Sequence, residues 1–268
     1  MTTQGRPLRI ACIGWGAISR SAAQLLEGTP VEIVAVAVRS KGTRDDLPAG
    51  ATIIMGPDEL AGTDADLVVE AASHESVAQW GRPALAAGMD FIVSSVSAFA
   101  DADLLEELRD LATRNDAQLE IHAGALGGVD ALSAARLLGI DRVEHRIIKP
   151  PRSWCDTPAE ELCDLGGLTE ATAFFSGTAS DAASEFPKNA NVAMTTALAG
   201  IGPDKTRITL VADPDATTNR HEISASGAFG ELAVTMSNKA LEANPKTSAM
   251  TALNLVRAIQ NRVTSVVI

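Results

Sequence analysis

The sequence predicts an α/β fold in which a doubly wound parallel sheet is followed by an α+β domain with a mixed or antiparallel sheet. Up to residue 125, short apolar runs alternate with amphipathic stretches at helical spacing, which is typical of parallel strands covered by helices. From residue 206 onward, three runs with strand character follow one another with only turn residues between them. A chain of 268 residues is long enough for two such domains.

The composition restricts the partners and the compartment. There are 22 Lys and Arg against 34 Asp and Glu, and the formal net charge of −12 disfavours nucleic acid or an anionic membrane surface as a partner. The three cysteines fit neither a disulfide framework nor a zinc spacing, so we expect no metal site. No apolar run approaches about 18 residues and no targeting signal is recognisable, so we expect a cytoplasmic globular protein.

The first predicted strand, residues 9–13, turns sharply into a helix through two glycines. Such a turn lets backbone N–H groups approach a ligand closely, and the N-terminal end of the following helix attracts an anion. Two glycines can also serve turn geometry alone, but this turn follows the first apolar run and opens an amphipathic stretch, which favours a dinucleotide site of the Rossmann type. We therefore expect the pyrophosphate of a nicotinamide cofactor to be bound by Gly14, Gly16, Ala17 and Ile18.

The residues after the second predicted strand, 31–38, bear on the choice of cofactor. An acidic residue at this point binds the adenosine 2′-hydroxyl of NAD, whereas a basic residue accepts the 2′-phosphate of NADP. Here stand Arg39, Ser40 and Lys41, with Arg44 further on. We expect Arg39 to contact the cofactor, and NADP to be used as well as or instead of NAD; the alternative is a solvated basic loop.

The remaining elements of the first domain alternate regularly. The loops 71–74, 94–97 and 123–128 follow predicted strands and should lie at the carboxyl edge of the sheet, where open α/β sheets bind their ligands. Strands are predicted at residues 51–54, 66–72, 91–95 and 118–122, and helical segments at residues 18–26, 57–60, 76–87 and 104–113.

The second half predicts a different organisation. Residues 150–170 are too irregular to assign, and residues 244–248 are expected to cap a final helix that runs to about residue 261 and packs back on the first domain. Helices are predicted at residues 129–138, 178–185 and 191–199, and strands at residues 143–148, 206–212, 221–226 and 229–237.

These elements lead us to divide the chain into a dinucleotide-binding domain, residues 1–125 plus 246–268, and a substrate and dimerisation domain, residues 126–245. The apolar alternation within residues 206–237 leaves one sheet side in need of cover. We therefore expect a symmetric homodimer through the second domain.

The chain has no tyrosine and four histidines, so the candidates for proton transfer are few. His74 follows a strand near the expected cofactor and is a candidate contact, whereas His122 is predicted to be an interior histidine. His145 stands between two charged residues of a strand and is expected to be exposed. His221 begins a strand after a polar loop, where a histidine can be structural or can face a crevice.

Two strings in the second half are specific: Pro-Lys-Asn-Ala-Asn-Val at 187–192 and Asn-Pro-Lys-Thr-Ser at 244–248. With residues 177–183, 219–223 and 227–230, the glycine turn and the loop 123–125, they resemble the L-aspartate dehydrogenase family over nearly the whole chain. The resemblance implies that His221 is the catalytic acid/base and that Ala125 and Asn191 contact the nicotinamide end of NAD or NADP.

The resemblance also implies the reaction, hydride transfer between Cα of L-aspartate and the nicotinamide, which gives iminosuccinate and then oxaloacetate and ammonia, or the reverse amination. His221 would accept the proton of the amine, so the rate should fall on the acid side with a pKa in the histidine range. The two carboxylates of this small dicarboxylate amino acid need cations or N–H donors, and the candidates are Lys149, Arg152, Lys188 and Lys246.

Two positions depart from the pattern of the family. Ser19 stands where the third glycine of the first turn is common, and Ser73 precedes His74 where glycine is common. Neither change removes a functional group, but either can shift cofactor affinity or substrate choice. Two other functions stay open: a cofactor-binding sensor that has lost the chemistry, and a reductase of another small imine or oxo-diacid.

Overall fold

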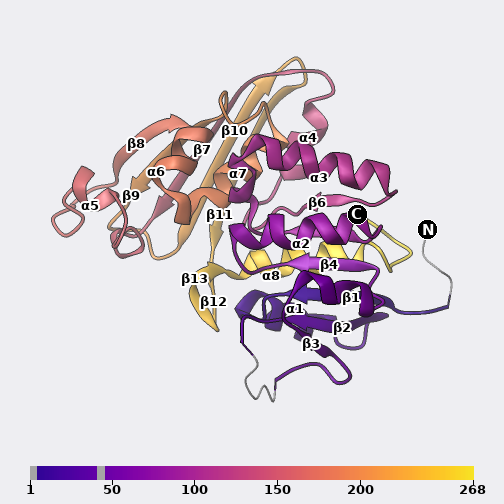
Figure 1. The fold of residues 1–268 in the computed structure, drawn as a ribbon. Coiled ribbons are helices and arrows are strands. Elements are labelled where there is room, and N and C mark those ends of the chain that lie inside the picture. The colour runs from indigo at the N-terminus through magenta and orange to yellow at the C-terminus, as the bar shows by residue number, and fades with distance from the viewer. Residues whose placement is uncertain (1–4, 41–45) are drawn as a thin grey trace. The chain divides into compact units, whose positions relative to one another are not determined.

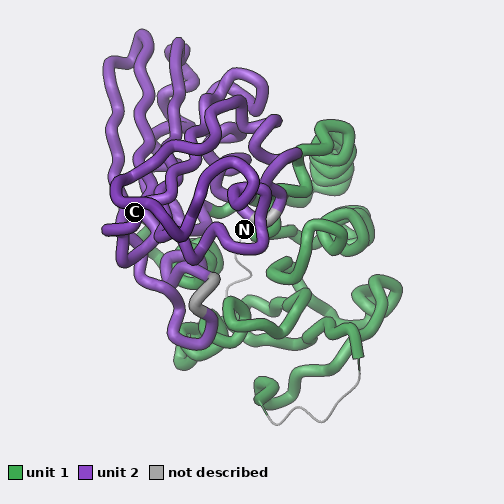
Figure 2. Tube along the Cα trace, turned by 90° about the vertical axis from the view of Figure 1, so that its left-hand side faces the viewer, with its two compact units in different colours: residues 1–122, 252–268 green, residues 123–251 purple. Residues whose placement is uncertain are grey.

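A computed structural model describes residues 5–40 and 46–268, with the side chains of Lys188, Pro245 and Lys246 outside the description. The chain forms two compact units, shown in Figure 2. Unit 1 comprises Met1–His122 and Ala252–Ile268, and unit 2 comprises Ala123–Thr251. The roles that the sequence assigns to residues 1–125 plus 246–268 and to residues 126–245 stay predictions.

Unit 1 is built on a six-stranded parallel sheet (Figure 1). Its strand order is β3-β2-β1-β4-β5-β6, so the order reverses at β1, and the predicted doubly wound parallel sheet is confirmed. The inner strands are apolar at successive positions because both of their faces are buried. The strands are β1 (Leu8–Ile13), β2 (Val31–Ala37), β3 (Thr52–Ile54), β4 (Leu67–Glu70), β5 (Asp90–Val93) and β6 (Leu119–Ile121).

Helices cover both faces of this sheet. On one face, α2 (His74–Ala86) packs so closely that a Cβ added at Gly81 would lie 2.8 Å from the Phe91 ring and 3.2 Å from Leu108 of α3 (Ala102–Arg114). On the other face, α1 (Ala17–Leu26) and α8 (Ala249–Gln260) bury apolar side chains against the strands. Short 3₁₀ helices, η1 (Pro57–Gly62) and η2 (Val96–Ala100), complete the connections.

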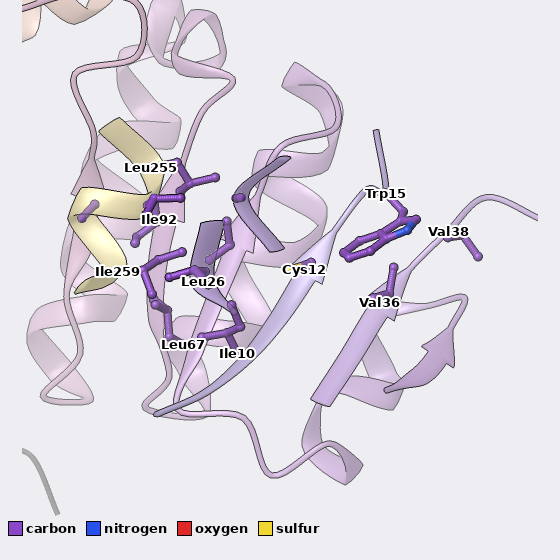
Figure 3. Close-up of a cluster of buried hydrophobic side chains, with 14 residues drawn as sticks. Ile10, Cys12, Trp15, Leu26, Val36, Val38, Leu67, Ile92, Leu255 and Ile259 are labelled. Atoms are coloured by element: carbon purple, nitrogen blue, oxygen red, sulfur yellow. The ribbon is translucent and has the colours of Figure 1, made fainter. Parts of the chain in front are cut away.

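The last helix confirms the prediction that the end of the chain returns to the first sheet. Figure 3 shows Leu255 and Ile259 of α8 beside Leu26, Leu67 and Ile92, in one buried cluster. The predicted cap at residues 244–248 is confirmed at Ser248, which directly precedes α8 and accepts a hydrogen bond from the Met250 N–H at 3.2 Å. The same residues also form β13 (Asn244–Ser248), which the sequence did not predict and which pairs with β12 (Ala240–Leu241) as a two-stranded antiparallel sheet.

Unit 2 is built on a five-stranded mixed sheet with the order β11-β10-β7-β9-β8. The central strand β7 runs parallel to β9 and antiparallel to β10, which confirms the predicted mixed sheet. The strands are β7 (Ile140–Lys149), β8 (Thr172–Thr178), β9 (Arg207–Ala212), β10 (Asn219–Gly227) and β11 (Gly230–Asn238). The helices include α4 (Val129–Ala135), α5 (Ala159–Leu162), α6 (Ala179–Glu185) and α7 (Ala190–Ala199), with short 3₁₀ turns η3 (Pro151–Ser153) and η4 (Pro187–Asn189).

The alternation along β7 separates a buried face from an exposed one. Arg146 is exposed and pairs with Glu222 of β10 at 3.4 Å, whereas His145 points to the opposite face and is fully buried. The prediction of an exposed His145 is therefore wrong, because its charged neighbours occupy the other face of the strand.

The apolar alternation of β11 is also used inside unit 2. A Cβ added at Gly128 would lie 2.7 Å from Val234, and one added at Gly127 would lie 2.8 Å from the sulfur of Met236. Leu232 packs against the buried cluster around Leu132. The apolar side chains that suggested a dimer contact are therefore half-buried within unit 2 itself. The exposed positions of this strand are Gly230, Glu231, Ala233, Thr235 and Ser237.

Candidate functional site

The glycine turn between β1 and α1 has the geometry that an anionic ligand requires. Gly14 has a φ of +88°, which favours glycine, and Gly16 is the N-cap of α1. No described side chain caps this helix, and a Cβ added at Gly16 would meet nothing within 4 Å among the described atoms. The first N–H groups of α1, around Ala17 and Ile18, thus adjoin open space at the positive end of a ten-residue helix, which fits a pyrophosphate.

Ser19 stands at the position of the third glycine and stabilises the turn by a hydrogen bond. It is buried, and its hydroxyl donates a hydrogen bond to the Gly14 carbonyl at 2.8 Å. The serine therefore closes the turn with a bond that a glycine could not make. The departure from the family pattern leaves the turn intact.

Gly14 also packs directly on the loop after β4. A Cβ at this position would lie 2.8 Å from Cβ of Ala72 and 3.0 Å from the Ala71 carbonyl oxygen. A larger residue would push the turn and the loop apart. The loop that follows β4 consequently shapes the glycine turn.

A fully buried carboxylate, Glu70, fixes this loop and the loop after β5. Its Oε1 accepts from the backbone N–H groups of Ala72 at 2.7 Å and Ser73 at 3.1 Å. Its Oε2 accepts from the N–H groups of Ser94 at 3.3 Å and Ser95 at 2.9 Å. The hydroxyls of Ser76 and Ser95 lie 2.9 and 2.8 Å from Oε1.

Sequence analysis did not single out Glu70. The signal was present, since an acidic residue that ends an apolar strand, with serines in both following loops, needs donors if it is buried. The position was predicted only as part of a strand, with no role for its carboxylate.

Arg39 follows the strand end that adjoins the glycine turn. The Gly14 N–H donates to the Ala37 carbonyl at 3.0 Å, so the end of β2 adjoins the glycine turn and Arg39 follows it two residues later. Arg39 is exposed and makes no ion pair with any described residue. Lys41 and Arg44 lie outside the described residues.

Two other predicted histidines lie in unit 1. His74 is exposed, with its Nε2 3.2 Å from Glu75. His122 is buried with its Nε2 2.8 Å from the Ser94 hydroxyl, and burial lowers its pKa to about 4. The interior assignment of His122 is confirmed.

In unit 2, His221 of β10 lies in a buried polar cluster rather than at a surface. Only 3% of it is exposed, and its Nδ1 is 3.1 Å from Nε2 of His145. Burial, with the Lys149 charge as a smaller cause, lowers the pKa of His221 to about 3. Burial also lowers the pKa of His145 well below its usual range, so both rings are neutral near pH 7.

Lys149 ends β7 on the same side of the cluster. Its Nζ donates to Oδ1 of Asn189 at 2.5 Å and lies 4.9 Å from the centre of the Trp154 ring. Burial lowers the pKa of this ammonium group from 10.5 to about 8. Arg152 follows in η3, whereas the side chains of Lys188 and Lys246 lie outside the description.

The segment that leads into α7 carries the remaining predicted contacts. Asn191 is exposed in the first turn of α7, and Thr196 of the same helix contacts His145. The Ala125 carbonyl accepts from Asn238 at the end of β11 at 2.7 Å. The structure therefore gathers His221, Lys149 and the start of α7 within unit 2, and Gly14, Gly16, Ala17, Ile18 and Arg39 within unit 1.

Within residues 5–40 and 46–268, no three His, Cys, Asp or Glu side chains come close enough to hold a metal ion. None of the helices in these ranges is both long enough and apolar enough to cross a bilayer.

Comparison with known proteins identifies the family. Residues 14–122 match the NAD-binding domain of homoserine dehydrogenase, and residues 130–262 match the C-terminal domain of aspartate dehydrogenase. The L-aspartate dehydrogenase of Brucella anthropi is 56% identical over 262 residues, which cover 97% of this chain and 98% of that protein. The chain belongs to the L-aspartate dehydrogenase family. The resemblance seen in the sequence is thereby confirmed.

Further relatives agree with this membership. The L-aspartate dehydrogenase of Cupriavidus taiwanensis is 44% identical and covers 95% of this chain and 97% of that protein. The aspartate dehydrogenase structure from Thermotoga maritima superposes with a TM-score of 0.78 at 27% identity, covering 97% of this chain and 99% of that one. The chain is thus an NAD(P)-dependent amino-acid dehydrogenase by family, with NAD or NADP as its cofactor.

The contacts of Glu70 generate a prediction. Glu70→Gln puts an NH₂ group opposite backbone N–H donors, so the free energy of unfolding should fall by about 2–4 kcal/mol and the Kd for NAD(H) should rise. Urea denaturation and calorimetric titration measure the two effects. Glu75→Gln, at an exposed glutamate of the same region, should leave the stability almost unchanged. Equal stability of the two variants would contradict the role of Glu70.

Proposed function

We propose that this family member catalyses the NAD(P)-dependent oxidation of L-aspartate to iminosuccinate, which water converts to oxaloacetate and ammonia, or the reverse amination. The observation that carries the proposal is the buried, neutral imidazole of His221 near the Lys149 ammonium group, in the part of the chain that matches the C-terminal domain of aspartate dehydrogenase. A base and a cation together suit a substrate with an amine and two carboxylates.

His221 is the acid/base of the proposed mechanism. Hydride can leave Cα of aspartate only when the amine has lost its extra proton, and a neutral imidazole accepts that proton. The bound nicotinamide supplies the acceptor for the hydride. The imidazolium of His221 then returns its proton as water adds to the imine and ammonia leaves.

The other residues bind and orient. Lys149 holds a substrate carboxylate by a charge-assisted hydrogen bond, with Asn189 and Trp154 fixing its ammonium group. Asn191 and Ala125 contact the nicotinamide end of the cofactor. Gly14, Gly16, Ala17 and Ile18 bind the pyrophosphate, and Arg39 lies at the adenosine 2′ position.

Replacing the proposed base tests the mechanism. His221→Ala should lower kcat by about 10²–10⁴ while the Kd for NAD(H) stays within about twofold, because the dinucleotide turn belongs to the other unit. Stopped-flow turnover and fluorescence titration separate the two quantities. Because His221 is buried, some loss of stability is expected as well, contrary to the expectation of a residue that faces a crevice. Near-normal turnover in His221→Ala, with loss of turnover in His74→Ala, would move the role to His74.

The low pKa of His221 leads to a pH profile different from the one that the sequence suggested. A pKa of about 3 lies far below the ordinary histidine value of 6.5, so the imidazole stays unprotonated as the pH falls through 6. The acid limb of the rate due to this group therefore lies below the usual histidine range.

Lys149 generates a prediction on the alkaline side. Its ammonium form binds the carboxylate and is lost as the pH rises through about 8, so the KM for aspartate should increase above that pH. Lys149→Met should raise KM about 10- to 100-fold at pH 7 and remove this pH dependence. Lys205→Met, at an exposed lysine of the same unit, is the control and should keep the profile. An unchanged KM in Lys149→Met would assign the carboxylate to another cation.

Cofactor choice tests Arg39. If its guanidinium group binds the 2′-phosphate, Arg39→Asp should weaken NADP binding about 10- to 100-fold and NAD binding far less. Arg114→Asp makes the same charge change at an exposed site of α3 and should leave the ratio of the two Kd values unchanged. Equal weakening of NAD and NADP by Arg39→Asp would place the 2′ position elsewhere.

We also propose a homodimer through unit 2. The proposed contact uses the exposed face of its sheet, where Arg146 pairs with Glu222 and Arg142 pairs with Glu144. Sedimentation at micromolar concentration should give twice the mass of 27.8 kDa. A monomer under these conditions would contradict the proposal.

A further inference from the structure

His221 is the end of a buried hydrogen-bonded chain. Its Nδ1 lies 3.1 Å from Nε2 of His145, whose Nδ1 lies 2.9 Å from the Thr196 hydroxyl. That hydroxyl lies 3.0 Å from the carbonyl oxygen of Val192, one turn earlier in α7. His145 and Thr196 are fully buried and His221 is almost so, hence water does not compete for these bonds.

The number of protons sets the direction of every bond in this chain. The Val192 carbonyl can only accept, so the single hydroxyl proton of Thr196 points to it and the hydroxyl oxygen accepts from the Nδ1–H of His145. A neutral imidazole has one N–H, so Nε2 of His145 carries a lone pair. That lone pair accepts the Nδ1–H of His221.

The same count leaves Nε2 of His221 with a free lone pair. No residue that the structure describes makes a hydrogen bond to this nitrogen. In the reversed direction, the Thr196 hydroxyl would donate to Nδ1 of His145 and would no longer donate to the Val192 carbonyl. His145 would then donate from Nε2 to Nδ1 of His221, and His221 would carry its proton at Nε2. The forward direction makes three hydrogen bonds and the reversed one makes two.

We propose that His145 and Thr196 are positioning residues that hold His221 in the Nδ1–H tautomer, with Nε2 as the atom that takes the substrate proton. Once Nε2 is protonated, the Nδ1–H of the imidazolium still donates to the lone pair of His145, so the charged form keeps its partner. The catalytic consequence rests on the proposed function of His221, whereas the tautomer itself does not.

Nitrogen NMR on the whole protein tests the tautomer without any turnover. In protein labelled with ¹⁵N-histidine, two-bond ¹H–¹⁵N correlations at pH 7 should show His145 and His221 both protonated at Nδ1, with assignments from the loss of each signal in His145→Gln and His221→Gln. A proton at Nε2 of His221 would overturn the inference and leave the proposed function standing. An unlabelled wild type that binds NAD(H) but never consumes aspartate would instead overturn the proposed function.

Substitution of Thr196 tests the consequence. Thr196→Val removes the acceptor for His145, so the NMR spectrum should show mixed tautomers and kcat should fall about tenfold with KM for aspartate and cofactor unchanged. Thr196→Ser keeps the hydroxyl and should restore both the tautomer and kcat.

Thr195 supplies the matched control for this substitution. It is buried on the same helix and donates the same kind of bond, to the Asn191 carbonyl at 2.9 Å, but it contacts no described histidine. Thr195→Val should keep the tautomers and kcat. An equal loss of kcat in the two valine variants would mean that only the packing of α7 matters, and would overturn the positioning role.

Discussion

Unit 1 depends on one buried carboxylate. Removing Glu70 from water is costly, and the cost is offset only because four backbone N–H groups and two hydroxyls surround it. The four N–H groups come from the loops after β4 and β5, so one carboxylate joins the two loops. The loops are therefore held in one conformation. The glycine turn packs on Ala72 without room for a Cβ, so it is held in one conformation as well. The glycine turn is preorganised by the centre of the sheet, not by the turn residues alone.

In unit 2, the two-residue period of the central strand β7 separates charged side chains from the buried histidine cluster. One face of β7 exposes Arg142 and Arg146, which pair with carboxylates, while the other buries His145 beneath α7. Because β10 pairs with β7 with His221 opposite Ile147, the two histidines reach each other across the strands. The helix contributes Thr196 to the buried side and Asn191 to the exposed side.

The elements that the sequence predicted well are those with local signals. The parallel strands, the glycine turn and the last helix follow from apolar runs, glycines and helical spacing. Strand β8 was missed because its register shifts between Ala173 and Phe175, which breaks the alternation. The pairing of β13 was missed because the polar residues of this strand also lead into the cap that Ser248 makes on α8. The environments of His145 and Glu70 depend on partners 51 and 24 residues away, such as Thr196 and Ser94, which no local pattern contains.

The return of α8 to unit 1 has a consequence for how the protein is made. The first segment of unit 1 is synthesised before unit 2, and the second segment, which contains Leu255 and Ile259, is synthesised after it. Until then, Ile10, Leu67 and Ile92 are not covered by these two side chains as they are in the folded protein. At about 5–20 residues per second, the intervening Ala123–Thr251 takes on the order of 6–26 s to synthesise. During that time one face of the parallel sheet stays partly uncovered in the nascent chain, while unit 2, which is continuous, can fold without waiting. Folding of the first-made unit is therefore completed last.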